Sequence, residues 1–349
     1  MPVSQDDSTL PKQSGPGSER PGSSSAPIPP EATCSDFAAP ELTVIVVSYN
    51  TAALTLAALR TLYAQTTRTR FHCVVWDNNS TDGSVEAVAR EFPQAELVAS
   101  KDNLGFARAN NVVAERATTP WLLLLNPDTE VHDSAVDRLM DFARAHPQAG
   151  IWGGRTVFPD GSPNIASCWG KITPWSVACL ALGLSAAFSK SEFFNPEAYG
   201  GWQRDTVREV DIVVGCFLLI RRELWNKLGG FNLKYYMYGE EADLCLRAKA
   251  EGWRPMIDPD AEIMHIVGAS AGRASNKAVQ VLKARTTLIR DHWSPAMVPF
   301  GLATIWFGYG LRWLVTRPFA LAPTPGLQAK AKRWSDIWSA RRNWLAGYP

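Results

Sequence analysis

Four consecutive leucines, residues 122–125, run directly into Asn126, Pro127 and Asp128. A short apolar run that ends in turn residues is typical of a strand buried on both faces of a sheet. Open α/β sheets bind ligands beyond the carboxyl ends of such strands. The residues that follow the leucine run, Asp128 above all, are therefore the first candidates for a functional site.

Strand and helix patterns alternate throughout residues 42–150. Apolar, β-branched runs begin at Leu42 and Phe71, a shorter run spans Glu96–Ala99, and apolar residues at helical spacing lie between them. This alternation predicts an α/β fold with a mostly parallel sheet that helices flank. Neither the glycine fingerprint of dinucleotide-binding enzymes nor a phosphate-binding loop follows the first strand, which disfavours both classes.

Composition limits the function classes. The formal net charge of +1 does not favour nucleic-acid binding, and the six cysteines form no C-x-x-C pair, which argues against a zinc site. Because no secretion signal is evident at the start, we expect reduced thiols and a cytoplasmic protein. Residues 1–40 contain eight prolines, eight serines and three glycines, and this composition predicts a disordered tail.

Two segments of the second half also carry structural signals. Residues 172–189 contain no charge, but Pro174 makes a membrane-spanning helix doubtful, so we expect a buried or membrane-grazing helix. Residues 210–220 are mostly apolar and predict a single continuous strand.

The chain from residue 291 onward differs in composition from the rest. Residues 293–311 carry no charge, whereas residues 312–349 carry seven Lys or Arg against one Asp, and six of the fourteen tryptophans lie beyond residue 292. Tryptophan interleaved with basic residues suits a membrane interface. We therefore expect helices at a membrane surface in residues 291–349. The alternative is that residues 293–311 form a core helix.

Asp128 can supply an anionic oxygen to a divalent cation such as Mg²⁺ or Mn²⁺, whereas Asn126 offers only a neutral amide. His265 follows another predicted strand, and an imidazole near Asp128 would make a mixed ligand set more suited to Mn²⁺. The alternatives are an ordinary Asn-Pro-Asp turn and a structural histidine.

A second group of acidic residues comprises Glu240, Glu241 and Asp243. An acidic first turn of a helix is one interpretation, since the helix dipole favours carboxylates there, and it suits Asp243 well. Direct displacement at a sugar carbon requires a carboxylate base within reach of the acceptor hydroxyl. Glu241 or Glu240 can fill that role.

With these motifs in place, the sequence resembles the family 2 inverting glycosyltransferases of the GT-A fold, in particular the rhamnosyltransferase-like members that build bacterial cell-envelope glycans. The resemblance covers about residues 42–270. It rests on the order and spacing of these motifs: Val-Ser-Tyr-Asn at 47–50, Asp-Asn-Asn-Ser-Thr-Asp-Gly at 77–83, Asn-x-Gly-Phe-Ala at 103–107 with Asn110 and Asn111, Asn-Pro-Asp at 126–128, Gly-Gly-Phe at 229–231, Glu-Glu-x-Asp-Leu at 240–244, and His265.

The resemblance implies which residues bind the nucleotide-sugar donor. Asp77 would lie near the base, in a nucleotide pocket that Ser48 and Asn50 also line. Asn103 and Asn110 would lie near the ribose and diphosphate. The remaining donor-binding candidate is Asn126.

The resemblance also implies the metal and catalytic residues. Asp128 matches the second acid of the family's D-x-D motif, His265 matches a histidine that completes the metal site, and Glu241 stands where the catalytic base is usually Asp. Asn126 replaces the first acid of the motif and leaves fewer charges for the metal. The extra methylene of Glu241 moves its carboxylate by roughly a bond length, so Glu240 stays an alternative base.

The resulting hypothesis is a metal-dependent inverting glycosyltransferase. It would move a deoxyhexose such as rhamnose from a nucleotide diphosphate sugar to a lipid-linked or cell-envelope glycan acceptor, at the inner face of the cell membrane. Residues 41–150 would form the nucleotide-sugar-binding half, 151–290 the acceptor-binding and catalytic half, and 291–349 the membrane-interface helices. The alternatives are a catalytically impaired membrane-associated glycan-assembly protein and a nucleotidyltransferase of similar fold.

Overall fold

The computed structural model describes residues 39–266 and 274–349, and residues 39–349 group into one compact unit. The predicted disordered tail, residues 1–40, therefore lies almost entirely outside the described residues. The predicted boundaries near residues 150 and 290 stay a prediction.

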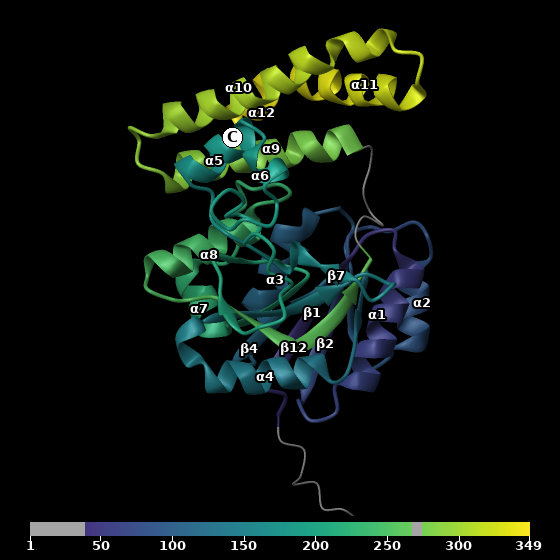
Figure 1. Ribbon diagram of the computed structural model, residues 1–349. Coiled ribbons are helices and arrows are strands. Elements are labelled where there is room, and N and C mark those ends of the chain that lie inside the picture. The colour runs from purple at the N-terminus through teal and green to yellow at the C-terminus, as the bar shows by residue number, and fades with distance from the viewer. Residues whose placement is uncertain (1–38, 267–273) are drawn as a thin grey trace, which may run out of the picture. The chain divides into compact units, whose positions relative to one another are not determined.

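A large mixed sheet forms the centre of the unit (Figure 1). Its main strands lie in the order β3-β2-β1-β4-β11-β6-β12-β5. Only β11 and β5 run against the direction of the other strands of this path, so the sheet is mostly parallel, as the sequence predicts. In chain order these strands are β1 (Leu42–Ser48), β2 (Phe71–Asp77), β3 (Glu96–Ala99), β4 (Trp121–Leu125), β5 (Thr129–Val131), β6 (Ile151–Val157), β11 (Phe217–Arg221) and β12 (Met256–His265).

Helices cover both faces of this sheet (Figure 1). The side chains of β4 alternate between the two cores: Leu123 and Leu125 pack on one face, while Leu122 and Leu124 pack on the other. The first face is covered by α1 (Ala52–Gln65), α2 (Ser84–Glu91) and α4 (Ala135–Ala145), and the second by α3 (Gly105–Arg116), α7 (Arg222–Leu228) and α8 (Glu240–Ala250). The leucine run is therefore a strand buried on both faces, as predicted.

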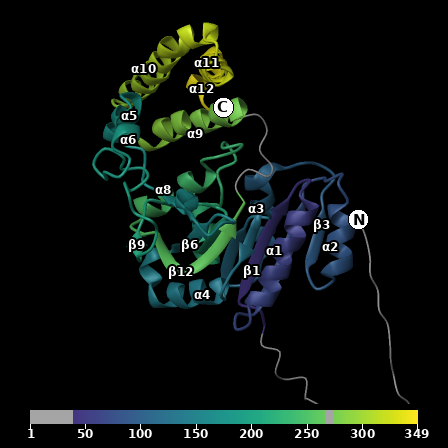
Figure 2. The same cartoon turned by 45° about the vertical axis from the view of Figure 1, so that its right-hand side comes forward.

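The C-terminal helices pack together with α5 and have a hydrophobic core of their own (Figure 2). This helical layer comprises α5 (Pro174–Ala181), α9 (Ala274–His292), α10 (Val298–Thr316), α11 (Pro325–Ser339) and α12 (Arg341–Ala346). The smaller elements are α6 (Leu184–Ala187), β7 (Pro163–Asn164), β8 (Cys168–Trp169), β9 (Arg208–Glu209), β10 (Ile212–Val213) and the 3₁₀ turns Pro147–Ala149, Ile165–Ser167 and Arg317–Leu321.

Two predicted elements are each interrupted. Instead of one strand over residues 210–220, β10 pairs with β8 while β11 joins the main sheet between β4 and β6. The chain changes partner around Gly215, where an added Cβ would lie 3.2 Å from the Phe106 ring. The helix expected at 172–189 likewise divides into α5 and α6, because Gly183 adopts a left-handed φ of 76° between them.

Helix α10 packs against α5, α9 and α11 within the helical layer. A Cβ at Gly308 would lie 2.6 Å from the Ala181 Cα, so α10 and α5 approach closely there. Pro299 stands in the first turn, where the missing N–H costs no helical hydrogen bond. Within residues 39–266 and 274–349, no helix has both the length and the apolar character needed to cross a membrane.

Truncation of Leu123 tests the buried position of β4. Leu123 has no exposed surface, so Leu123→Ala should lower the free energy of unfolding by about 2–5 kcal/mol. Leu321 is 92% exposed, and Leu321→Ala should change it by less than about 0.5 kcal/mol. Urea denaturation measures both, and equal losses in the two variants would contradict the assigned burial.

Candidate active site

Pairing between β5 and β12 brings Asp128 and His265 together. Thr129, the first residue of β5, lies opposite His265, the last residue of β12, and the Ile266 N–H donates to the Asp128 carbonyl at 2.9 Å. His265 Nε2 lies 3.3 Å from Asp128 Oδ1. The proximity on which the predicted metal site depends is therefore present.

Both side chains of this pair are largely buried. His265 Nδ1 has no hydrogen-bond partner among the described residues. Burial alone would lower the pKa of the His265 imidazole, but the neighbouring Cys216 and Asp128 outweigh burial and raise the pKa. Cys216 and Asp128 thus favour the protonated imidazole in this partly desolvated position.

The donor atoms of this pair suit a divalent cation that is shared with a ligand. Over residues 39–266 and 274–349, no three His, Cys, Asp or Glu side chains gather into a complete metal site. One carboxylate and one imidazole leave several coordination positions open, and cations of this kind are commonly held by one or two protein groups plus substrate phosphates. The residues therefore fit a cation bound together with a diphosphate.

Asp77, at the end of β2, has one carboxylate oxygen that accepts a hydrogen bond and one that has no hydrogen-bond partner among the described residues. Its Oδ1 accepts a hydrogen bond from the Ser80 N–H at 2.8 Å. Its Oδ2 is buried and has no partner among the described residues. A buried oxygen without a donor is costly, so Asp77 is suited to accept a hydrogen bond from a ligand.

Asn50 joins the loops that follow β1 and β2. It adopts a left-handed φ of 51°, its N–H donates to Ser80 Oγ at 2.8 Å, and its Oδ1 accepts from the Thr81 N–H at 2.8 Å. Asn50 therefore ties the loop after β1 to the loop that follows Asp77.

Three other predicted donor-binding residues make hydrogen bonds to other residues of the protein. Ser48 is buried, with Oγ 2.9 Å from Thr55 Oγ1. Asn103 Oδ1 accepts from the Gly105 N–H at 2.9 Å, at the start of α3. Asn110 is fully buried and donates to the Phe106 carbonyl at 2.9 Å. Direct contact of these residues with a donor stays a prediction, as it does for Asn126, whose N–H donates to the Cys216 carbonyl at 3.0 Å.

Glu240 and Glu241 open α8 directly after a turn with left-handed residues, Tyr238 at φ 64° and Gly239 at φ 99°. Glu240 is buried, and its Oε2 has no partner among the described residues. Burial, together with the adjacent Glu241, raises the pKa of Glu240 well above its usual range. Burial also raises the pKa of Glu241. Both carboxyl groups are therefore harder to ionise than an exposed glutamate, and carboxyl groups with shifts of this kind are candidates for acid–base chemistry.

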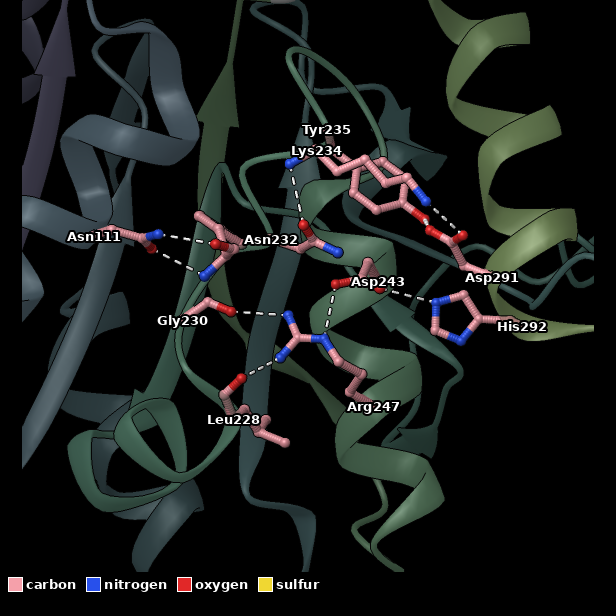
Figure 3. Close-up of polar contacts among 11 residues, drawn as sticks. Asn111, Leu228, Gly230, Asn232, Lys234, Tyr235, Asp243, Arg247, Asp291 and His292 are labelled. Carbon is pink, nitrogen blue, oxygen red and sulfur yellow. Dashed lines mark hydrogen bonds and ion pairs between the residues drawn. The ribbon is translucent and has the colours of Figure 1, made fainter. Parts of the chain in front are cut away.

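Asp243, by contrast, is committed to a polar network (Figure 3). It accepts from Arg247 Nε at 2.8 Å and lies 2.9 Å from His292 Nε2 through its other oxygen. Arg247 donates to the carbonyls of Leu228 and Gly230. Asp243 thus fastens α8 to the Gly-Gly turn and to α9. It also stands in the first turn of α8, the position considered for it from the sequence.

Sequence reasoning missed several residues that hold the site together. The Asn111 amide bonds to both the N–H and the carbonyl of Phe231, at 2.9 and 2.8 Å, and so joins α3 to the Gly-Gly-Phe segment (Figure 3). Asp82 Oδ2 accepts from the Ala52 N–H at the start of α1. Both lie in motifs that the sequence singled out, but His292 is not part of any motif and gives no local signal.

A family model described as glycosyl transferase family 2 matches residues 43–229, just over half of the chain. The chain belongs to this family. A relative from Mycobacterium tuberculosis, N-acetylglucosaminyl-diphospho-decaprenol L-rhamnosyltransferase, is 30% identical over 211 residues, which cover 56% of this chain and 67% of the relative. The O-antigen biosynthesis protein RfbC of Myxococcus xanthus is 26% identical over 66% of this chain but only 18% of its own length.

Solved structures agree on the fold of this family 2 glycosyltransferase. A mannosyltransferase from Pyrobaculum calidifontis, in complex with GDP-Man and Mn²⁺, superposes with a TM-score of 0.54 at 20% identity and covers 89% of this chain and 88% of that one. GalNAc-T7 with UDP, GalNAc and Mn²⁺ gives a TM-score of 0.53 at 14% identity, over 87% of this chain and 56% of that one. The predicted family and the predicted GT-A fold are confirmed.

Replacement of Glu240 by the neutral residue Gln tests whether its carboxyl group is buried and has a raised pKa. A buried carboxyl with a raised pKa binds its proton more tightly in the folded state, so its contribution to stability is lost as pH rises through the folded pKa. Glu240→Gln should therefore raise the melting temperature at about pH 8, and the gain should shrink toward about pH 4. Exposed Glu115 provides the control Glu115→Gln. A gain for Glu240→Gln that is constant with pH would contradict the buried, ionisable state.

Proposed function

We propose that this glycosyltransferase is a metal-dependent inverting enzyme that uses a nucleoside diphosphate sugar. The observation that carries the proposal is the His265–Asp128 contact at 3.3 Å, with Asp77 at the carboxyl end of β2 in the same sheet. The family defines the transferase activity. The metal, the stereochemical course and the substrates are the proposed parts.

The protein groups divide into two sets. Asp128 and His265 would hold Mg²⁺ or Mn²⁺, which supplies positive charge to the diphosphate as it leaves. Glu240 or Glu241 accepts the proton of an acceptor hydroxyl while that oxygen bonds to the anomeric carbon and the diphosphate departs from the opposite side. Such displacement inverts the anomeric configuration. A carboxylate with a raised pKa is a stronger base for this step.

Donor recognition is assigned to Asp77 and its neighbours. The uncommitted Asp77 Oδ2 would accept a hydrogen bond from the N–H of a pyrimidine base. A deoxyhexose such as rhamnose is the proposed sugar, with support from the name of the mycobacterial relative.

A lipid-linked acceptor at a membrane surface completes the proposal, with the protein at the inner face of the cell membrane. The mycobacterial relative is named for a diphospho-decaprenol substrate. Helix α10 and the turn after it expose large apolar side chains, namely Trp306, Phe307, Leu311, Leu314, Val315 and Leu321. The net charge of about +6 over residues 312–349 complements anionic headgroups.

Replacing Asp128 should abolish transfer. Asp128→Ala removes the one carboxylate of the proposed cation site, so kcat/KM should fall by about a hundredfold or more, and EDTA should have a similar effect on the wild type. Asp160, in an exposed loop, gives the control Asp160→Ala. Product formation from candidate nucleotide sugars measures both, and full activity of Asp128→Ala would contradict the cation site.

Membrane association has a direct test. The wild type should co-sediment with vesicles that contain phosphatidylglycerol and bind weakly to neutral phosphatidylcholine vesicles, because both apolar insertion and charge contribute. Leu314→Asp with Val315→Asp should weaken binding by about tenfold or more. The matched control is Leu233→Asp, an exposed leucine outside the helical layer. Equal binding by both variants would contradict the proposed surface.

A further inference from the structure

The loop that precedes Glu240 is anchored to the last turn of α9 (Figure 3). Lys234 Nζ lies 2.8 Å from Asp291 Oδ1, and the Tyr235 hydroxyl donates to Asp291 Oδ2 at 3.0 Å. The next residue of α9, His292, contacts Asp243 at 2.9 Å. Consecutive residues of α9 therefore hold the chain on both sides of Glu240 and Glu241.

Tyr348, near the end of the chain, forms a second anchor for the same loop. Its hydroxyl donates to the Met237 carbonyl, its backbone N–H donates to Thr287 Oγ1 at 2.8 Å, and its ring contacts Tyr235 with centroids 6.1 Å apart. Tyr348 is buried, and burial raises the pKa of its phenol to about 12. The hydroxyl is therefore protonated and able to donate near neutral pH.

The anchored loop contains a strained turn. Tyr238 adopts a left-handed φ of 64°, which is uncommon for a bulky residue and persists only where the surroundings enforce it. At Gly239, with φ 99°, an added Cβ would lie 3.1 Å from the Ala284 Cβ of α9. The backbone thus packs directly against α9 immediately before the two glutamates.

We propose that Tyr348 and Asp291 are positioning residues that hold the turn at residues 236–239 so that the carboxylates of Glu240 and Glu241 are aligned for catalysis. The helical layer is then part of the catalytic apparatus, in addition to any membrane contact. This inference rests on the proposed role of Glu240 or Glu241 as the base.

Positioning of the base should affect the chemical step and not donor binding. Two of the proposed donor contacts, Asp77 at the end of β2 and Asp128 after β4, are in segments that Tyr348 does not contact, because Tyr348 bonds to the turn before α8. A carboxylate displaced by a fraction of an ångström loses alignment with the acceptor hydroxyl, whereas the diphosphate site is untouched. A change confined to kcat therefore identifies this role.

Tyr348→Phe keeps the ring and removes the hydroxyl that bonds to Met237. We expect kcat to fall by about tenfold with the donor KM unchanged. Asp291→Ala should likewise lower kcat and leave the donor KM unchanged. The control is Tyr309→Phe, in α10, whose ring contacts Trp334 and Trp344 and which should retain wild-type kcat. Assays run well below the melting temperatures separate positioning from loss of folded protein.

Hydrogen exchange supplies a readout that does not depend on turnover. The backbone amides of residues 236–243 should exchange faster in Tyr348→Phe and Asp291→Ala than in the wild type or Tyr309→Phe. Wild-type kcat in an active Tyr348→Phe enzyme, or unchanged exchange at these amides, would overturn the positioning role. If the wild type transfers no sugar, but the amides of residues 236–243 still exchange faster in Tyr348→Phe and Asp291→Ala, the result would contradict the proposed function and leave the positioning of the turn intact.

Discussion

The antiparallel pairing of β5 with the end of β12 is the constraint on which the site depends. After β4, buried between two cores, the chain turns through Asn126 to Asp128 and joins the far edge of the sheet beside His265. Two residues 137 positions apart in the chain thus come within 3.3 Å. Because β-sheet register is discrete, a one-residue slip would point one of them away.

Several candidate site residues have buried polar atoms without partners among the described residues. Asp77 Oδ2, Glu240 Oε2 and His265 Nδ1 are all uncommitted among the described residues. Each such atom reduces the stability of the folded protein unless a ligand satisfies it. Asp77 and His265 end strands and Glu240 begins α8, which are positions where a substrate site is expected, and buried unpartnered atoms also occur elsewhere among the described residues, as at Thr66 and Arg204.

Local patterns were sufficient to predict the first half of the fold. The apolar runs of β1, β2 and β4 and the turn residues after them are short-range signals. The candidate Asp128 follows from a strand end, whereas Asp77 became a candidate only through the family resemblance. The meeting of Asp128 with His265 required the three-residue strand β5, which is too short to recognise from the sequence. The strand at residues 210–220 is interrupted near Gly215, where Phe106, a residue distant in the sequence, packs closely. The hydrogen bond from Tyr348 to Met237 also joins distant residues. Local periodicity in the sequence predicts neither of them.

We propose that Asp128 and His265 hold a divalent cation together with a donor diphosphate. Titration of Mn²⁺ followed by electron paramagnetic resonance, with and without UDP or dTDP, measures this binding. We expect that one of these nucleotides tightens Mn²⁺ binding and that Asp128→Ala and His265→Ala each weaken the ternary complex by at least about tenfold. Equal Mn²⁺ affinity in the wild type and both variants, with nucleotide present, would contradict it.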